Sequence, residues 1–198
     1  MKRTFLFLII LISSLTLVGC GNKAAEEYKT NIQEVADDIL ENSSKAESLL
    51  NQYASIWSYS IKSKGAIPIE DMVAQTGLDE GTVMEHFVIS YGDFITDDFS
   101  TNIYSMVSYY TETGELEEIE EKSKKIKSKI NELNNPPSDY EKVYDEILDM
   151  YTYSEEYIGL ALNPSGTLQD FNDSRNQLSN DILSKYKRVE AILPNEDK

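Results

Sequence analysis

Residues 28 to 62 read YKTNIQEVADDILENSSKAESLLNQYASIWSYSIK, and their apolar spacing decides the fold. Apolar side chains recur every three or four positions, which is the period of an amphipathic α-helix. The spacing predicts one helix from about residue 24 to residue 62, with Asn42 as the one polar interruption of its apolar face. At 1.5 Å per residue such a helix is about 60 Å long, so it needs partner helices of similar length. Its predicted inward residues are Ile32, Val35, Ile39, Ala46, Leu49, Tyr53 and Ile56.

The rest of the chain repeats this helical period between clear interruptions. A short helix is expected over 69–75, stopped by Gly77. A second helical region is expected over 82–133, with breaks near Asp97-Asp98 and Thr113-Gly114. Two final helices, on either side of the loop at 163–166, have the spacing of an antiparallel hairpin. The candidate inward residues of the second region include Val83, Phe87, Tyr91 and Phe94.

These segments together predict the fold class. No stretch of convincing length alternates polar and apolar residues as a half-buried strand does. We therefore expect an all-α protein, an elongated antiparallel helical bundle of three to five helices. The bundle should form a single domain over residues 25–194, followed by a C-terminal tail over 195–198.

The first twenty residues have the layout of a secretory signal. Lys2 and Arg3 precede an apolar run from Phe5 to Val18, and a small residue, Gly19, stands before the only cysteine, Cys20. The apolar run is about fourteen residues long, whereas a spanning helix needs about twenty. An uncleaved N-terminal membrane helix with an incidental cysteine is the alternative interpretation.

The quartet Leu17-Val18-Gly19-Cys20 resembles the lipobox of bacterial lipoproteins. The resemblance implies that residues 1–19 are a signal peptide removed after Gly19 and that Cys20 carries a diacylglycerol thioether. Residues 20–24 would then be the lipidated cysteine and a short tether. Two acyl chains are enough for stable anchoring, so we expect the protein to be held by Cys20 at the extracytoplasmic face of the cell membrane.

The host envelope is indicated only by composition and by one residue after the cysteine. The abundance of Lys, Asn, Ile and Tyr favours an AT-rich, Gram-positive host. Gly21 would, by the same resemblance, permit sorting to the outer membrane in a diderm.

The charge balance excludes several partners. The formal net charge is −17, and it becomes −19 when the segment holding Lys2 and Arg3 is removed. A protein with this much negative charge excludes nucleic acid as a partner, because phosphate backbones require a basic surface. It is also repelled by anionic lipid, so the acyl chains rather than the protein surface should hold it to the membrane. With no second cysteine, the exported domain has no internal disulfide.

The motifs that accompany catalysis are missing from the sequence. His86 is the only histidine, which removes every zinc pattern that needs two, and no glycine-rich phosphate loop or calcium loop occurs. We expect no enzymatic activity, no cofactor and no metal. Acidic pairs such as Asp37-Asp38 are interpreted as a solvated polar face rather than a cation site.

One segment superficially resembles a DNA-binding motif. Residues 69–83 have the spacing of a helix-turn-helix, but Asp79 and Glu80 stand where a DNA-facing surface needs Lys or Arg. The expectation is a compact helical corner.

A block of acids at 112–121 runs directly into a block of lysines at 122–129. This order predicts ion pairs one helical turn apart, namely Glu118 with Lys122, Glu120 with Lys124 and Glu121 with Lys125. Contact of the lysines with anionic lipid or a cell-wall polymer is the alternative.

A candidate binding surface follows from the aromatic residues. Ten of the twenty aromatic side chains lie between Tyr53 and Tyr110, in the least regular part of the chain. Tyr53 and Trp57 are expected in the core, and the candidate surface consists of Tyr59, Tyr91, Phe94 and Tyr109. The leading hypothesis is a non-enzymatic module for protein interaction or scaffolding. The alternative is a lipoprotein that binds or senses a small ligand such as a peptide, sugar or cation.

Overall fold

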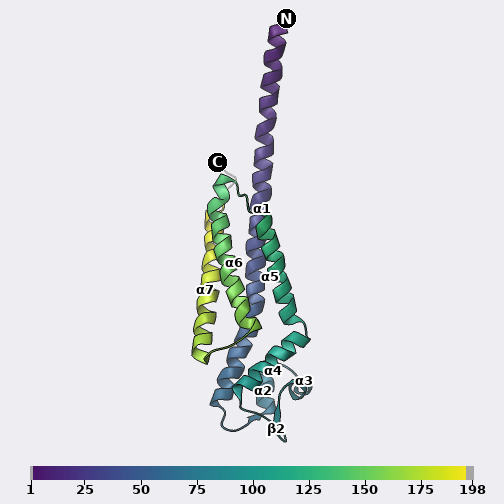
Figure 1. Ribbon diagram of the computed structural model, residues 1–198, viewed down its shortest axis with the longest axis vertical. Coiled ribbons are helices and arrows are strands. Elements are labelled where there is room, and N and C mark those ends of the chain that lie inside the picture. Colours follow the sequence, from purple (N-terminus) through teal and green to yellow (C-terminus); the bar gives the residue numbers. More distant parts are fainter. Residues whose placement is uncertain (1, 195–198) are drawn as a thin grey trace.

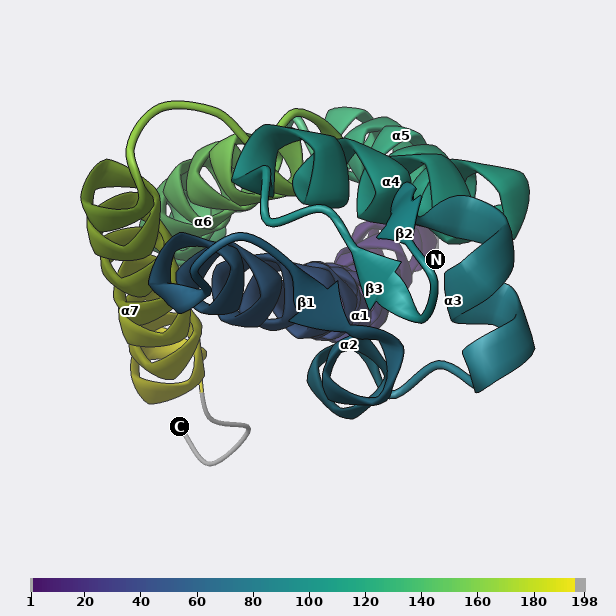
Figure 2. The same cartoon turned by 90° about the horizontal axis from the view of Figure 1, so that it is seen from below.

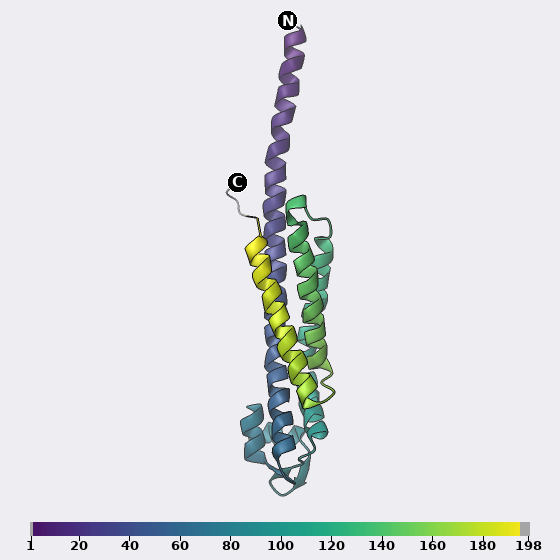
Figure 3. The same cartoon turned by 90° about the vertical axis from the view of Figure 1, so that its left-hand side faces the viewer.

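The computed structural model describes residues 2–194, with side chains from Lys23 onward. Its central element is α1 (Lys2–Lys62), which contacts α5 (Glu115–Glu132), α6 (Glu141–Leu162) and α7 (Leu168–Ile192). Helices α5 and α7 run opposite to α1, and α6 runs parallel to it, forming the elongated bundle seen in Figures 1 and 3. The predicted all-α bundle is confirmed. The lipobox side chains, Leu17 to Cys20, and the tail at 195–198 lie outside the described parts.

The apolar face of α1 forms the core of the bundle. All seven inward residues predicted for this helix are buried. Ala36, Leu50 and Trp57 are buried as well, because α1 is covered from several sides and its apolar face is wider than one stripe. Between residues 23 and 194, no helix is both long enough and apolar enough to cross a membrane.

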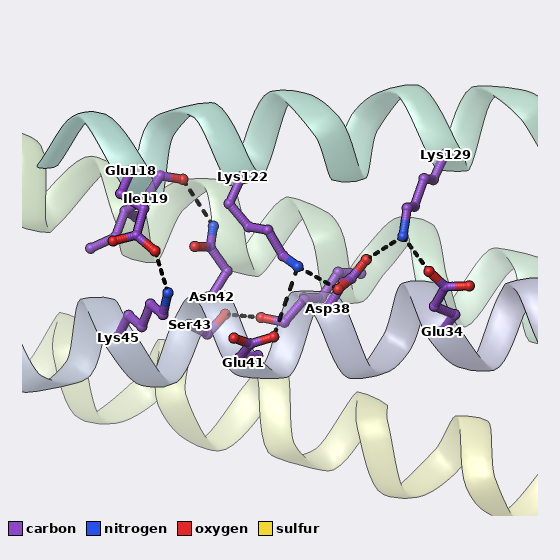
Figure 4. A network of polar contacts seen from close by, with 11 residues as sticks. Glu34, Asp38, Glu41, Asn42, Ser43, Lys45, Glu118, Ile119, Lys122 and Lys129 are labelled. Atoms are coloured by element: carbon purple, nitrogen blue, oxygen red, sulfur yellow. Dashed lines mark hydrogen bonds and ion pairs between the residues drawn. The ribbon is translucent and has the colours of Figure 1, made fainter. Parts of the chain in front are cut away.

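A polar belt joins α1 to α5 (Figure 4). Lys122 and Lys129 of α5 both donate to Asp38, at 2.5 and 2.7 Å, and Glu118 pairs with Lys45 at 2.5 Å. Glu118 and Lys122 thus reach across to α1 instead of pairing with each other, so that predicted pair is wrong. The predicted pairs within α5 do form at Lys124–Glu120, 2.8 Å, and Lys125–Glu121, 4.0 Å.

Asn42 lies fully buried inside this belt. Its Nδ2 donates to the carbonyl oxygen of Ile119 at 3.0 Å, while its Oδ1 has no hydrogen-bond partner among the described residues. The next residue, Ser43, shares a 2.8 Å hydrogen bond with Ser154 of α6. The predicted polar interruption, Asn42, therefore contacts α5, and the neighbouring Ser43 contacts α6.

The chain between α1 and α5 folds into a cap at the end of the bundle farthest from residue 23 (Figures 1 and 2). It contains α2 (Ile69–Thr76), α3 (Glu80–His86) and α4 (Phe99–Glu112). Three short strands, β1 (Ile67–Pro68), β2 (Ile89–Tyr91) and β3 (Phe94–Ile95), form an antiparallel sheet in the order β1-β3-β2. The expected helix over 82–133 is therefore wrong at 89–95, where the chain turns at Gly92 (φ +49°) and pairs with itself.

The predicted breaks around α4 are confirmed. Asp98 accepts a hydrogen bond from the backbone N–H of Thr101 at 2.7 Å and so caps the start of α4. Gly114, at φ +82°, separates α4 from α5. The helical corner is also present, because Gly77 ends α2 in a left-handed conformation and Asp79 caps α3.

The last two long helices form the predicted hairpin. A 3₁₀ turn, η1 (Ser138–Tyr140), leads into α6, and residues 163–167 connect α6 to α7. Glu146 of α6 joins the two helices through Lys185 at 2.8 Å and Arg188 at 2.6 Å.

Candidate interaction site at the tip of the rod

Two of the four predicted surface residues come together on the β-hairpin of the cap. The rings of Tyr91 and Phe94 stack with their centroids 5.0 Å apart. Tyr91 is 61% exposed, so its expected inward position is wrong, whereas its place in the candidate surface fits the structure. Phe94 is half-buried behind it.

The other two predicted surface residues are held by neighbouring side chains. Tyr59 is half-buried, and its hydroxyl donates to Asp71 Oδ2 at 2.6 Å, which ties α1 to α2 and raises the pKa of Tyr59. Tyr109 is also half-buried, with its ring 5.1 Å from the ring of His86. These contacts give Tyr59 and Tyr109 a structural role that Tyr91 does not have.

A groove that the sequence did not indicate lies beside the cap. It has a volume of about 430 Å³ and opens between the end of α1, the first half of α4 and the α6–α7 loop. Trp57 forms its floor, 3% exposed and stacked on Phe99 at 5.4 Å with the planes 11° apart. Phe171 supports Trp57 at 5.5 Å. The lining residues are Trp57, Phe99, Ser100, Ile103, Tyr104, Val107 and Leu162 to Gly166.

Comparison of the chain with protein-family models, with curated proteins and with solved structures found no match in any of the three.

Exposed apolar side chains gather at this end of the molecule. Tyr104 on the groove wall is 73% exposed. Further large apolar side chains reach solvent on the end of α1, on α3 and on the hairpin. They are Ile61, Met84, Val88 and Ile89. Solvent-exposed apolar side chains concentrated on one part of a protein mark sites of interaction.

The cap is also uniformly acidic. Residues 65–113 contain nine Asp and Glu residues and no Lys or Arg. Hydrogen bonds from Thr82 lower the pKa of Asp79, and those from Thr101 lower the pKa of Asp98, so both carboxylates are ionised at neutral pH. Across the described side chains, no three His, Cys, Asp or Glu residues are grouped to hold a metal ion.

Sequence reasoning missed Phe99, Tyr104 and the loop at 162–166 as site residues. Phe99 and Tyr104 belong to the aromatic-rich region, but whether they lie on the same face of a helix depends on where α4 begins. The loop lies about 60 positions further along the chain, and no local pattern indicates that it meets α4.

Proposed function

We propose that this protein is a lipid-anchored, non-enzymatic interaction module at the extracytoplasmic face of a Gram-positive cell membrane. The lipobox-like quartet ending at Cys20 supports the anchor. The observation that carries the interaction role is the gathering of exposed apolar side chains on the cap. The cap begins where α1 ends, about 60 Å along that helix from residue 24. A rod anchored at Cys20 would thus hold its most apolar exposed surface away from the lipid.

The anchor is tested by metabolic labelling with a fatty acid. Cys20→Ser removes the thiol that would carry the diacylglycerol, so labelling should be lost and the uncleaved precursor should accumulate. Cells expressing the unchanged chain provide the comparison. Unchanged labelling of the variant contradicts the anchor.

The interaction role is tested by photo-crosslinking in intact cells. A photo-crosslinking amino acid replaces Tyr91 on the hairpin or, as a matched control, Leu148, which is exposed on α6 outside the cap. We expect a defined adduct with another exported or membrane protein from position 91 only. Equal adducts from both positions, or none, contradict a specific surface on the cap.

A second candidate function is the binding of a small ligand, and the groove over Trp57 is the observation that favours it. Its volume of about 430 Å³ falls within the range of roughly 300–1,000 Å³ typical of small-molecule sites. A ligand bound only to the folded protein raises its melting temperature. Thermal-shift screening against small peptides, sugars and cations tests this candidate, and Tyr104→Ala should abolish any genuine shift.

A further inference from the structure

The groove over Trp57 combines an apolar floor with an exposed aromatic wall. None of its lining residues is charged, and its polar groups come from Ser100, Asn163 and Ser165. Trp57 and Phe99 are already stacked on each other, so the floor is preorganised. Tyr104 stands at the wall with most of its ring in solvent. Such a surface fits an apolar or aromatic side chain with polar backbone on either side.

Exposed carboxylates lie close in sequence to the lining residues of both walls. On one wall, Asp98 immediately precedes the lining residue Phe99 and caps α4. On the other, Asp170 lies in the first turn of α7, where its carboxylate accepts from the Thr167 hydroxyl at 2.7 Å. Residues 65–113 and 143–174, which include the lining residues of both walls, contain no Lys or Arg. Within these two segments, the charged residues nearest to the lining are therefore carboxylates.

We propose that the groove docks an extended segment of a partner protein in which an apolar or aromatic anchor is flanked by Lys or Arg. This inference rests on the proposed interaction role and names the chemistry of the partner. The anchor residue enters over Trp57 beside Tyr104, and the flanking cations face Asp98 and Asp170. Charge complementarity of this kind speeds association and excludes acidic segments, whose carboxylates would be repelled. Because the carboxylates are exposed, binding weakens as salt screens them.

The chain provides its own reporter for this site. Trp57 is the only tryptophan, and it lies in the floor of the groove. A side chain that packs into the groove changes the surroundings of that single residue and hence its fluorescence. Occupancy can therefore be followed without a label.

The test is selection from a random dodecapeptide library on the full-length protein held in a non-ionic detergent. We expect the enriched peptides to carry an aromatic or large apolar residue with Lys or Arg on both sides. A synthetic copy of an enriched peptide should change Trp57 fluorescence, and its counterpart with Glu in place of each cation should not.

Two variants locate the binding. Tyr104→Ala should weaken the peptide about tenfold or more, as loss of an aromatic anchor contact does. The double variant Asp98→Asn, Asp170→Asn should weaken it roughly three- to tenfold at low salt, and Asn preserves the cap on α4. Leu148→Ala and Glu27→Gln are matched controls, since both residues are exposed elsewhere, and they should leave affinity unchanged.

Three results would overturn the proposal: no enrichment, enrichment of neutral or acidic peptides, or binding indifferent to both groove variants. If photo-crosslinking at position 91 still captured a partner, the interaction role would stand while this docking site fell. If the selected peptides bound as expected but no cellular adduct formed, the docking site would stand and the proposed role would fall.

Discussion

Asp38 of α1 accepts hydrogen bonds from two lysines of α5. Burial raises the pKa of its carboxyl, but hydrogen bonds from Lys122 and Lys129 outweigh this effect and lower the pKa below its ordinary value. A lowered folded-state pKa means that the ion pairs stabilise the fold fully above about pH 4 and that this contribution is lost as the pH falls through the folded-state value. The side chain is only 14% exposed, so the contribution is larger than that of a typical surface pair.

Asp38→Asn should therefore lower the free energy of unfolding by about 1–2 kcal/mol at pH 7. Urea unfolding at several pH values measures the difference between variant and wild type, which should shrink progressively as the pH falls below about 4. Glu27→Gln, at an exposed position, should change the stability little at any pH. A difference at Asp38 that stayed constant down to pH 3 would show that the lysine pairs are not its source.

Substituting Asn42 should have the opposite effect on stability, because not all of its buried polar atoms are hydrogen-bonded. The Ile119 carbonyl that it contacts belongs to the interior of α5 and accepts a backbone hydrogen bond there as well, and Asn42 Oδ1 has no partner among described residues. Asn42→Leu keeps the branched shape of the side chain, removes an unsatisfied oxygen and adds apolar burial. We expect the free energy of unfolding to rise by about 1 kcal/mol, measured by urea unfolding. A loss of stability would mean that Asn42 is needed for helix register.

Substitutions at two glycines test where one helix ends and the next begins. Gly114 separates α4 from α5 at φ +82°, a conformation that costs any L side chain energy, whereas Gly159 lies inside α6 with open space where a Cβ would stand. Gly114→Ala should destabilise the protein by about 1 kcal/mol, and Gly159→Ala should stabilise it by roughly 0.5–1 kcal/mol. Thermal unfolding followed by circular dichroism measures both. Equal effects of the same sign would contradict a break at Gly114.

The long helices were predictable because their apolar period and their end signals agree. Ile32, Ile39 and Tyr53 repeat at helical spacing and are fully buried, and Asp98 and Gly114 mark the ends of α4. The β-hairpin formed by β2 and β3 was not predictable, because a short apolar run such as 87–89 is compatible with either a helix or a strand. Its strands are two or three residues long, and one of them, β3, pairs with Ile67 and Pro68, which lie far away in the sequence.

The candidate site was predictable only in part, because it too depends on contacts between residues that are far apart in the sequence. Tyr91 and Phe94 sit in an irregular, aromatic-rich segment, and that signal indicated a surface position for Tyr91, which is exposed, whereas Phe94 is half-buried. The same signal could not separate them from Tyr59, whose hydroxyl is taken by Asp71. The groove over Trp57 joins residues from three distant segments, so it exists only once the hairpin of α6 and α7 has packed beside α4.

At the scale of the whole molecule, charge is divided along the rod. The lysines of α5 are matched by acids of α1, including Glu34 and Asp38, whereas the cap carries nine acids and no Lys or Arg between residues 65 and 113. Anionic lipid repels an acidic surface over about a Debye length. A rod tethered at its other end by acyl chains should therefore stand away from an anionic membrane, with its cap outermost.

This orientation can be measured through Trp57, the only tryptophan, which lies about 50 Å along α1 from residue 24. In anionic vesicles with a dansyl-labelled lipid, energy transfer from Trp57 of the lipidated protein should be weak at low salt and should rise at high salt as repulsion is screened. The control carries Lys23→Trp and Trp57→Phe, which places the donor beside the anchor, so its transfer should be strong in both conditions. Strong transfer from Trp57 at low salt would mean that the rod lies along the membrane, and the cap would then meet lipid rather than a partner.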